Sequence, residues 1–244
     1  MDIKVSIITV CYQAEQTIER TLRSVSRQTY PHIEYIIIDG ASRDNTLNLV
    51  HEISPQAICI SEPDKGIYDA MNKGLRQATG EYVWFLNAGD ALPKEDTVET
   101  MFAEALSKGN ELPDIIYGDC LLINEYDKVL GPRRLRPPYQ LNWRSFRKGM
   151  LVCHQSFIAR RELCPEYDLQ YRFSADIDWC IRVMKRAYSY CRIDAPLSLY
   201  LHEGTTTNNH KASLIERFRI MRSHYGLCTT ILWHFLFLFL KTKR

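Results

Sequence analysis

The first half of the chain alternates between two patterns of hydrophobic positions. Four short runs, KVSIITV, IEYIIIDG, AICIS and EYVWFLN, are nearly continuous in β-branched and aromatic residues. Such runs are typical of strands that are buried on both faces of a parallel sheet. Between them, apolar residues such as Ile18, Leu22 and Val25 recur at helical spacing, and we expect further helices at 46–53 and 67–78. The alternation predicts an α/β fold in which helices cover a mostly parallel sheet.

After Pro113 the alternation becomes less regular. The stretch DIIYGDCLLI predicts a pair of strands, HQSFIARREL, YSYCRI and LSLYL predict further strands, and helices are expected at 176–184 and 212–225. A loop rich in proline and arginine, GPRRLRPPYQLNWRSFRKG, interrupts this half, and loops of that length are usually functional or mobile. The pattern divides the chain into three segments, 1–116, 117–210 and 211–244.

Composition narrows the class of protein without identifying it. With 244 residues, 45% of them hydrophobic, the chain can bury a core as one domain of two lobes or as two small domains. The formal net charge of +2 argues against a nucleic-acid partner held by overall electrostatics. The eight cysteines include no Cys-x-x-Cys pair, so we expect neither a zinc site nor a disulfide framework. The chain opens without a basic leader and a cleavable apolar segment, which favours a cytoplasmic protein.

Acidic residues follow two of the predicted strands, and glycine-rich phosphate loops are missing. Cys11, Tyr12 and Gln13 follow the first strand, in place of a Gly-x-Gly-x-x-Gly turn, a Walker loop or the glycine-rich loop of sugar nucleotidyltransferases. Asp39 and Asp90 lie at the ends of the second and fourth strands, at the edge where open α/β sheets bind ligands. Asp39 is also consistent with a residue that only caps a turn or a helix.

Four segments resemble the inverting family 2 glycosyltransferases, which have the GT-A fold. They are VSIITVCYQ, IIIDGASRDNT, DKGIYDAMNKGLRQATGEYVWFLNAGD and FSADIDWCIR; the likeness is close over the first 90 residues and looser up to Arg182. The sequence is most similar to enzymes of bacterial surface-polysaccharide synthesis, including the colanic-acid type. The resemblance implies a Rossmann-like, mostly parallel central sheet flanked by helices, a mixed acceptor-binding half and a C-terminal helical tail.

The resemblance also implies a reaction and a role for each segment. A sugar is transferred, with inversion, from a nucleotide diphosphate sugar, expected to be UDP-linked, to a hydroxyl of a lipid-linked or oligosaccharide acceptor. Segment 1–116 is expected to bind the nucleotide sugar, and segment 117–210 to bind the acceptor and carry the catalytic residue. The segment 211–244 is expected to be helical.

Three residues of segment 1–116 are assigned to the donor by the resemblance. Asp39 matches the residue that hydrogen-bonds the nucleotide base, and a carboxylate there selects a uracil-like ring with an imide N–H. Thr9 matches a position that flanks the base, and Asp69, in DKGIYDAMNKG, belongs to the same donor site. Asp44 is equally consistent with a contact to the nucleotide and with a cap on the following helix.

The metal-binding motif of the family is incomplete in this sequence. Where the family carries Asp-x-Asp, the chain has Asn87, Ala88 and Gly89, followed by Asp90. The resemblance implies Mn²⁺ or Mg²⁺ held by Asp90, with Asn87 as a weak neutral ligand and the diphosphate and water supplying the rest. His202, in LYLHEGTTT, matches a region near the diphosphate and is a further candidate ligand, although a histidine after a strand is more often a structural hydrogen-bonding residue.

Asp176 matches the catalytic base of the family, an acidic residue at the start of a helix. In SADIDWCIR, Ala175 replaces the first acid of the family pattern, which leaves Asp176 and Asp178. Inverting transfer requires a carboxylate near the acceptor hydroxyl, and a helix N-terminus favours the ionised form. The alternatives are that Asp176 only stabilises the helix dipole, and that Asp178 is held by Arg182, four positions further along.

Several residues of the second half are expected to face the acceptor. His154 and Gln155 begin a strand after the basic loop. The cations of that loop either bind an acceptor diphosphate or form a solvated surface; they are Arg133, Arg134, Arg136, Arg144, Arg147 and Lys148.

The tail carries an apolar run from Ile231 to Leu240 that is well short of the roughly 20 residues needed to span a bilayer. Because Lys241, Lys243 and Arg244 follow it, the tail is suited to lie peripherally on the anionic inner face of the cell membrane. The alternative is a core helix or the interface of a homodimer.

Two other functions stay open on the sequence alone. A sugar nucleotidyltransferase would use a similar sheet, but the missing glycine-rich first loop argues against it. A catalytically degenerate scaffold that only binds the nucleotide sugar is kept open by Asn87 and Gly89.

Overall fold

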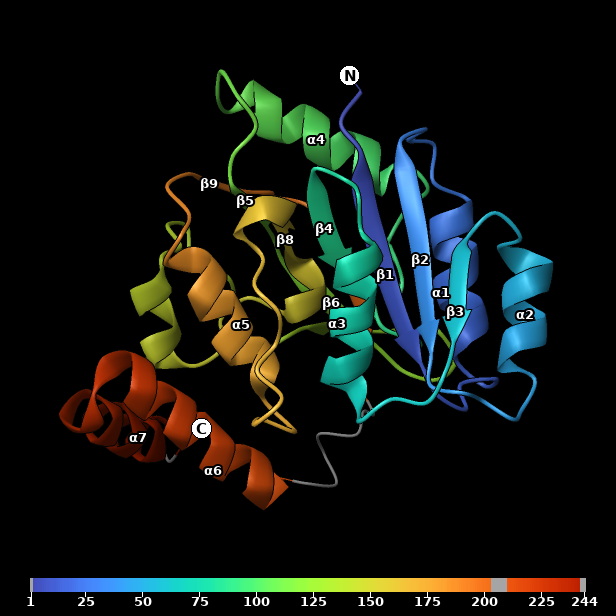
Figure 1. Cartoon of the computed structure of the whole chain (residues 1–244). Coiled ribbons are helices and arrows are strands. Elements are labelled where there is room, and N and C mark those ends of the chain that lie inside the picture. The colour runs from blue at the N-terminus through green and yellow to red at the C-terminus, as the bar shows by residue number, and fades with distance from the viewer. Residues whose placement is uncertain (1, 203–209, 242–244) are drawn as a thin grey trace.

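The computed structural model describes residues 2–202 and 210–241, which form a seven-stranded sheet, a three-stranded sheet and flanking helices (Figure 1). The large sheet has the order β3 (Ile58–Ser61), β2 (Ile33–Asp39), β1 (Val5–Cys11), β4 (Tyr82–Phe85), β8 (Phe157–Arg160), β5 (Ile115–Tyr117) and β9 (Tyr190–Arg192). Only β8 runs antiparallel to its neighbours β4 and β5. The expected α/β fold with a mostly parallel sheet is confirmed.

Helices cover both faces of this sheet because successive side chains of each strand point to opposite sides. They are α1 (Ile18–Ser26), α2 (Thr46–Ile53), α3 (Ile67–Gln77) and α4 (Thr97–Ser107). Ile8 and Ile38 pack against α3, whereas Ile7 and Ile37 belong to the opposite face with α1, α2 and α4. A Cβ at Gly74 would lie only 2.4 Å from the Ile8 side chain, so glycine is what lets α3 approach β1 this closely.

The second half of the chain contributes to both sheets. The small sheet has the order β10 (Ser198–Leu201), β6 (Cys120–Ile123) and β7 (Val129–Pro132). The prediction that DIIYGDCLLI forms a pair of strands is wrong: β5 already has β8 and β9 at its two edges, so the chain leaves the large sheet and begins the small one at β6. Strands on both sides of residue 116 share the large sheet, and the division into donor and acceptor segments stays a prediction.

The second half of the chain also contains the helices α5 (Ala175–Met184), α6 (His210–Tyr225) and α7 (Leu227–Lys241) and the short helices η1 (Trp143–Lys148), η2 (His154–Ser156) and η3 (Arg161–Leu163). We call α6 and α7 the C-terminal helix pair; Gly226, at φ +80°, joins them. The ring of Phe218 on α6 contacts that of His234 on α7 at 5.2 Å. Within the described residues, every helix is too short or too polar to cross a membrane.

Candidate active site

Asp39 ends β2 at the edge of the large sheet where β1 and β4 also end, and it pairs in register with Cys11. Its carboxylate is fully buried and accepts hydrogen bonds from the Ser42 amide (2.8 Å) and from the hydroxyls of Ser42 (2.5 Å) and Ser61 (2.7 Å). The Cys11 thiol, at 3.6 Å, is a fourth and weak donor. These contacts occupy the acceptor sites of an ionised carboxylate. Asp39 therefore braces the loops after β2 and β3, and its contact with a nucleotide base stays a prediction.

Tyr12 and Asp64, which the sequence pattern does not single out, lie beside Asp39. A Cβ on Gly40 would lie 3.2 Å from the Tyr12 ring and 2.6 Å from Oδ2 of Asp64, so both side chains pack over this glycine. Tyr12 is 62% exposed, and Asp64 accepts a hydrogen bond from the Gly66 amide at 2.8 Å. An exposed ring next to a carboxylate is suited to a heterocyclic base. The Asp-x-Gly turn after the third strand is the signal that would have found Asp64.

The other residues expected near the donor hold the loops of this edge. Thr9 is fully buried, and its hydroxyl donates to a main-chain carbonyl just after β4 at 2.7 Å. Asp69, in the first turn of α3, accepts from the Lys65 amide at 2.9 Å. Asp44 accepts from the amide (3.1 Å) and hydroxyl (2.6 Å) of Thr46, which is the capping arrangement. Donor contacts by Thr9 and Asp69 stay predictions.

Asp90 lies on the turn after β4 and is only 4% exposed. Its Oδ1 accepts a hydrogen bond from the Leu201 amide at 2.9 Å. Burial raises the pKa of Asp90 well above its usual range, because the hydrogen bonds from Leu201 and Gln155 and the charge of Arg20 offset only part of the lost hydration. A divalent cation at this carboxylate would supply the missing positive charge and favour the ionised form.

Asn87 lies on the same turn as Asp90, whose amide donates to the Asn87 carbonyl, and His202 follows β10. The Oδ1 atom of Asn87 is buried and accepts no hydrogen bond, which is rare for a buried amide and suits an oxygen ligand of a hard cation. His202 is exposed and directly follows Leu201, the residue that donates to Asp90. Over residues 2–202 and 210–241, no group of three or more His, Cys, Asp and Glu side chains is arranged to hold a metal. A cation here would therefore rely on Asp90, Asn87 and oxygens of the donor.

Asp176 is half-buried in the first turn of α5 and contacts helix α3. The Tyr68 hydroxyl on α3 donates to its Oδ1 at 3.3 Å, and burial raises the pKa of Tyr68, which keeps this hydroxyl protonated. Within the part of the chain that the structure describes, Oδ2 of Asp176 accepts no hydrogen bond. The Tyr200 side chain lies within electrostatic reach of both Asp176 and Asp90, so the two carboxylates lie in the same region of the molecule.

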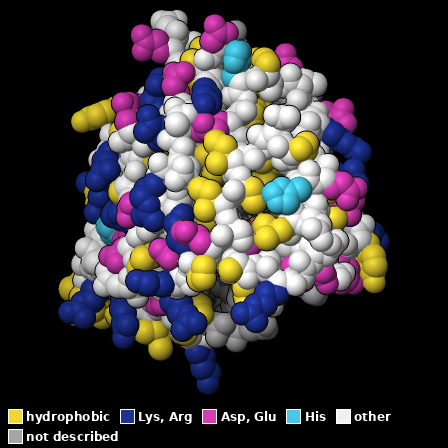
Figure 2. Space-filling model, turned by 45° about the vertical axis from the view of Figure 1, so that its right-hand side comes forward, with side chains coloured by type: hydrophobic (Ala, Val, Ile, Leu, Met, Phe, Trp, Pro, Cys, Tyr) yellow, Lys and Arg dark blue, Asp and Glu magenta, His cyan; other side chains and the backbone are white. Residues whose placement is uncertain are grey.

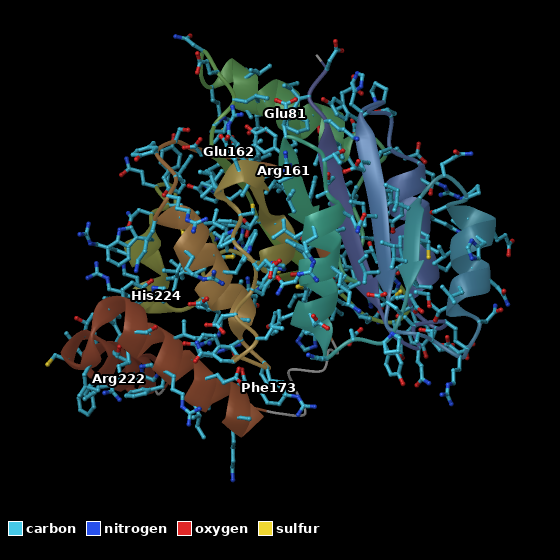
Figure 3. All side chains as sticks on the ribbon, viewed as in Figure 1. Glu81, Arg161, Glu162, Phe173, Arg222 and His224 are labelled. Atoms are coloured by element: carbon cyan, nitrogen blue, oxygen red, sulfur yellow. The ribbon has the colours of Figure 1, made fainter. Side chains whose placement is uncertain are left out.

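Asp178 has a different environment although it lies in the same helical turn. Its Oδ2 accepts from Arg182 at 2.6 Å and its Oδ1 from His224 of α6 at 2.7 Å. Figure 3 labels His224. Burial alone would raise the pKa of Asp178, but the hydrogen bonds and charges of His224 and Arg182 lower it below the usual value. The contact between Asp178 and Arg182 is confirmed, and Asp178 joins α5 to the C-terminal helix pair.

The cations of the loop after β7 divide into paired and unpaired groups. Arg136 is held by Asp119 through two hydrogen bonds, of 2.8 and 2.5 Å. Arg133 points inward: Nη2 donates to the Met150 carbonyl at 3.1 Å, while Nη1 is buried without a partner. The Arg133 guanidinium lies within electrostatic reach of Asp176. An unpaired guanidinium N–H in this position is suited to a phosphate oxygen.

The expectation that His154 faces an acceptor is wrong. His154 is 4% exposed, its Nε2 lies 2.7 Å from the Tyr167 hydroxyl, and its ring stacks on Phe85 at 5.2 Å. Burial lowers the pKa of His154 to about 4, so the ring is neutral at neutral pH. Gln155 is buried as well, and both residues belong to the core because the aromatic rings around η2 exclude solvent.

Known glycosyltransferases are similar to this chain in sequence. The family model for glycosyl transferase family 2 matches residues 6–167. An uncharacterized glycosyltransferase of Mycobacterium tuberculosis is 34% identical over 184 residues, which cover 73% of this chain and 68% of that protein. The PGL/p-HBAD biosynthesis glycosyltransferase of the same species is 32% identical over 184 residues (72% and 68%). The amylovoran biosynthesis glycosyltransferase AmsB of Erwinia amylovora is 26% identical over 230 residues (88% and 75%).

Solved structures share the fold at lower identity. Residues 1–349 of S. aureus TarS, in complex with UDP-GlcNAc, match with a TM-score of 0.71 and 18% identity over 90% of this chain; this chain spans 65% of that one. The mannosyltransferase PcManGT from Pyrobaculum calidifontis, in complex with GDP-Man and Mn²⁺, matches with a TM-score of 0.66 and 17% identity (96% and 69%). The large sheet and its flanking helices thus form a GT-A fold, and the match over residues 6–167 shows that the chain belongs to glycosyl transferase family 2.

Proposed function

We propose that this chain is an inverting glycosyltransferase that moves a sugar from a UDP-linked donor to a hydroxyl of a lipid-linked or oligosaccharide acceptor. The contrast along α5 carries the proposal. Asp178 is held by Arg182 and His224, whereas Oδ2 of Asp176 accepts no hydrogen bond within the described residues. Tyr200 lies within electrostatic reach of both Asp176 and Asp90, and we propose that the two carboxylates border one crevice. Inverting transfer uses two such groups: one carboxylate that accepts a proton, and a second one that holds a cation with the leaving group.

The donor base is proposed to lie where β1, β2 and β3 end. Tyr12 offers an exposed ring for stacking, and Asp39 and Asp64 are the two carboxylates beside it. Asp39 is the residue that the family resemblance assigns to the base, but a base N–H can reach it only if one of its present donors turns away. Asp64 has fewer internal contacts, so the two carboxylates are rivals for this role. Thr9 and Asp69 support the same pocket from β1 and α3.

The diphosphate is proposed to lie between Asp90 and Arg133. The carboxylate of Asp90 and the unpaired Oδ1 of Asn87 would hold Mn²⁺ or Mg²⁺, with His202 close by. The cation would supply positive charge to the diphosphate as it leaves. The unpaired Nη1 of Arg133 would donate to a phosphate oxygen from the other side of the crevice.

Asp176 is proposed to act as the general base. Its carboxylate takes the proton of the acceptor hydroxyl while the acceptor oxygen forms a bond to the anomeric carbon of the sugar. The bond from that carbon to the diphosphate breaks with its electron pair on the diphosphate oxygen, so attack and departure occur on opposite faces and the anomeric configuration inverts. Tyr68, through its hydrogen bond to Oδ1, fixes the direction in which the carboxylate points.

The acceptor class is proposed from the names of two relatives, and the membrane location from the C-terminal tail. The names of two relatives, an amylovoran and a PGL/p-HBAD biosynthesis glycosyltransferase, support an acceptor from bacterial polysaccharide or glycolipid synthesis. Because the tail carries an apolar run followed by cations, we propose a cytoplasmic protein that contacts the inner face of the cell membrane through its tail. A homodimer through the same tail is the competing arrangement.

A panel of sugar nucleotides, incubated with the chain and Mn²⁺, tests the function. The proposal expects one UDP-sugar to be consumed faster than the others, with UDP as product and slow hydrolysis in the absence of an acceptor. Release of pyrophosphate would indicate the nucleotidyltransferase instead. Tight binding with no turnover, for every sugar and with lipid extracts added, would indicate the degenerate scaffold.

A further inference from the structure

Helix α7 presents an apolar stripe to solvent. Leu227, Ile231 and Phe235 are spaced four apart, and Leu232 and Leu236 flank them on the same side of the helix. These side chains are between 37% and 57% exposed, whereas Thr230, one position before Ile231, is fully buried. The stripe therefore lies on the side of α7 that faces away from the body of the molecule.

The surroundings of this stripe are cationic. Arg217, Arg219 and Arg222 lie on α6, which packs against α7, and no Asp or Glu follows Glu216 in the sequence. Figure 2 shows Lys and Arg side chains gathered along the lower margin of the molecule, at the height at which Figure 1 draws α6 and α7, with hydrophobic side chains between them. Arg222 on α6 belongs to this margin (Figure 3). A stripe of large apolar side chains bordered by cations complements an anionic, apolar surface.

A pocket of about 220 Å³ adjoins the start of α7. It is lined by Trp143, Arg144 and Arg147 of η1, His224 and Tyr225 of α6, and Thr229 of α7. The Arg144 guanidinium lies 4.8 Å from the centre of the Trp143 ring, and the Lys185 ammonium lies 5.0 Å from the same ring. Within the described residues, no ion pair joins Arg144, Arg147 or Lys185 to a carboxylate. The pocket thus holds cations in place without neutralising them.

The stripe and the pocket are parts of one surface. Lys148, the last residue of η1, lies 5.8 Å from the ring of Trp233, which stands between Leu232 and Phe235 on α7. Tyr225 stacks on Trp143 at 5.6 Å and donates to its carbonyl at 2.6 Å, so η1 and the C-terminal helix pair are fixed to each other. Cations of η1 are thereby held beside the apolar side chains of α7.

We infer that this surface docks the protein on an anionic phospholipid bilayer, with the α7 stripe among the acyl chains and a headgroup phosphate bound by Arg144 and Arg147. An Arg pair recognises phosphate oxygens through its parallel N–H groups, and Thr229 lies in the first helical turn, where main-chain amides lack intrahelical partners. A second copy of the chain fits less well, because two such surfaces would bring unpaired cations together. The inference specifies the membrane contact of the proposed function but does not depend on the sugar transfer.

Co-sedimentation of the full chain with vesicles tests this inference. We expect sedimentation with vesicles of phosphatidylcholine and phosphatidylglycerol and little with phosphatidylcholine alone. The double variant Arg144→Gln/Arg147→Gln should partition about thirtyfold less, since each cation at an anionic surface contributes about fivefold. Ile231→Gln/Leu232→Gln, which keeps helix propensity, should lose at least about tenfold through the lost apolar contact. The matched control Arg27→Gln/Lys94→Gln removes two exposed cations, from the residue that follows α1 and from the loop beside it, and should change partitioning less than about twofold.

Two results would overturn the inference. Either the wild type fails to sediment with the anionic vesicles, or the Arg144/Arg147 variant partitions like the control. Sedimentation velocity without lipid could give a third contradicting result. If the wild type is a dimer that dissociates in the Ile231/Leu232 variant, the stripe binds a second copy of the chain. Donor affinity, measured by calorimetry in all variants, should be unchanged, so that failure of membrane docking is distinguished from failure of the proposed sugar transfer.

Discussion

The two ends of the proposed donor site differ in how completely their polar groups are satisfied. At the base end, Asp39 receives hydrogen bonds from Ser42 and Ser61 and is fully buried. At the reacting end, which comprises Asn87, Asp90, Arg133 and Asp176, Asn87 Oδ1 and Arg133 Nη1 are buried without partners. Asp90 at that end is buried with too little positive charge nearby to keep it ionised easily.

This difference indicates that the protein alone satisfies the polar groups at one end of the proposed site, whereas a ligand is needed at the other end. Unsatisfied buried polar atoms are costly, at about 1–3 kcal/mol each, and persist where a ligand completes them. In the proposed function, the base end is formed in advance by the protein, whereas the reacting end would be completed by the donor diphosphate and a cation. Substitutions at the reacting end should therefore act mainly on kcat and metal dependence, and substitutions at the base end mainly on donor affinity.

The largest effect is expected at Asp176. Asp176→Asn should lower kcat by about 10²- to 10⁴-fold with little change in donor affinity, because it removes general-base assistance and keeps the size of the side chain. Single-turnover transfer and calorimetry measure the two quantities. The matched variant Asp178→Asn should keep the chemistry and lower the free energy of unfolding by about 1–3 kcal/mol, since it weakens contacts with His224 and Arg182. The opposite pattern would make Asp178 the base.

The next effect concerns the cation. Asp90→Asn should lower kcat by roughly 10²-fold and remove the stimulation by Mn²⁺, because the reacting end loses its only anionic ligand. Circular dichroism should show an intact fold, since Asn can still accept from the Leu201 amide. A wild type that works at full rate in excess chelator would contradict the metal assignment and leave Arg133 as the group that neutralises the diphosphate.

The base end is tested by comparing Asp39→Ala with Asp64→Ala. If the removed carboxylate accepts a hydrogen bond from the imide N–H of the base, UDP binding should weaken by about 1.5–3 kcal/mol. This is roughly a 10- to 150-fold rise in Kd. Calorimetry with UDP and with GDP shows which carboxylate contacts the base. Only the variant that lacks this contact should lose the preference for UDP over GDP. If neither variant changes the preference, the base is recognised elsewhere.

The smallest effect is a dependence of stability on pH. Because burial raises the pKa of Asp90, the folded protein keeps a proton that the unfolded chain loses above about pH 4. The folded state then binds more protons, so the metal-free protein should lose stability as pH rises through this range up to the raised pKa. Mn²⁺ needs the ionised carboxylate, so its stabilising effect should grow over the same range. Thermal melts with and without Mn²⁺ measure both trends, and Asp90→Asn should show neither.

Local pattern was enough to predict the fold of the first half of the chain. The helix at 46–53 and the strand that ends at Asp39 have the expected bounds, because β-branched runs and helical spacing are properties of short segments. The change of sheet between β5 and β6 was not predictable, since it depends on β8 and β9 arriving later in the chain to occupy both edges of β5.

Some residues of the candidate site were also predictable from the sequence, whereas their partners from distant segments were not. Asp176 and Asp90 are visible as acids at a helix start and a strand end, and Arg182 follows Asp178 at the spacing of a helical ion pair. The partners that distinguish the two acids of α5, Tyr68 for Asp176 and His224 for Asp178, come from distant segments and carry no local signal. Burial of His154 in an aromatic cluster likewise became evident only from the packing.

The central claim is that the reacting end performs inverting sugar transfer with Asp176 as base. Proton NMR of the product of a single turnover, from an α-linked UDP-sugar selected by the donor panel and its acceptor, tests it most directly. The account predicts a product that is entirely β-linked, formed rapidly by the wild type and by Asp178→Asn and slowly by Asp176→Asn. An α-linked product, or equal rates for Asp176→Asn and the wild type, would contradict it.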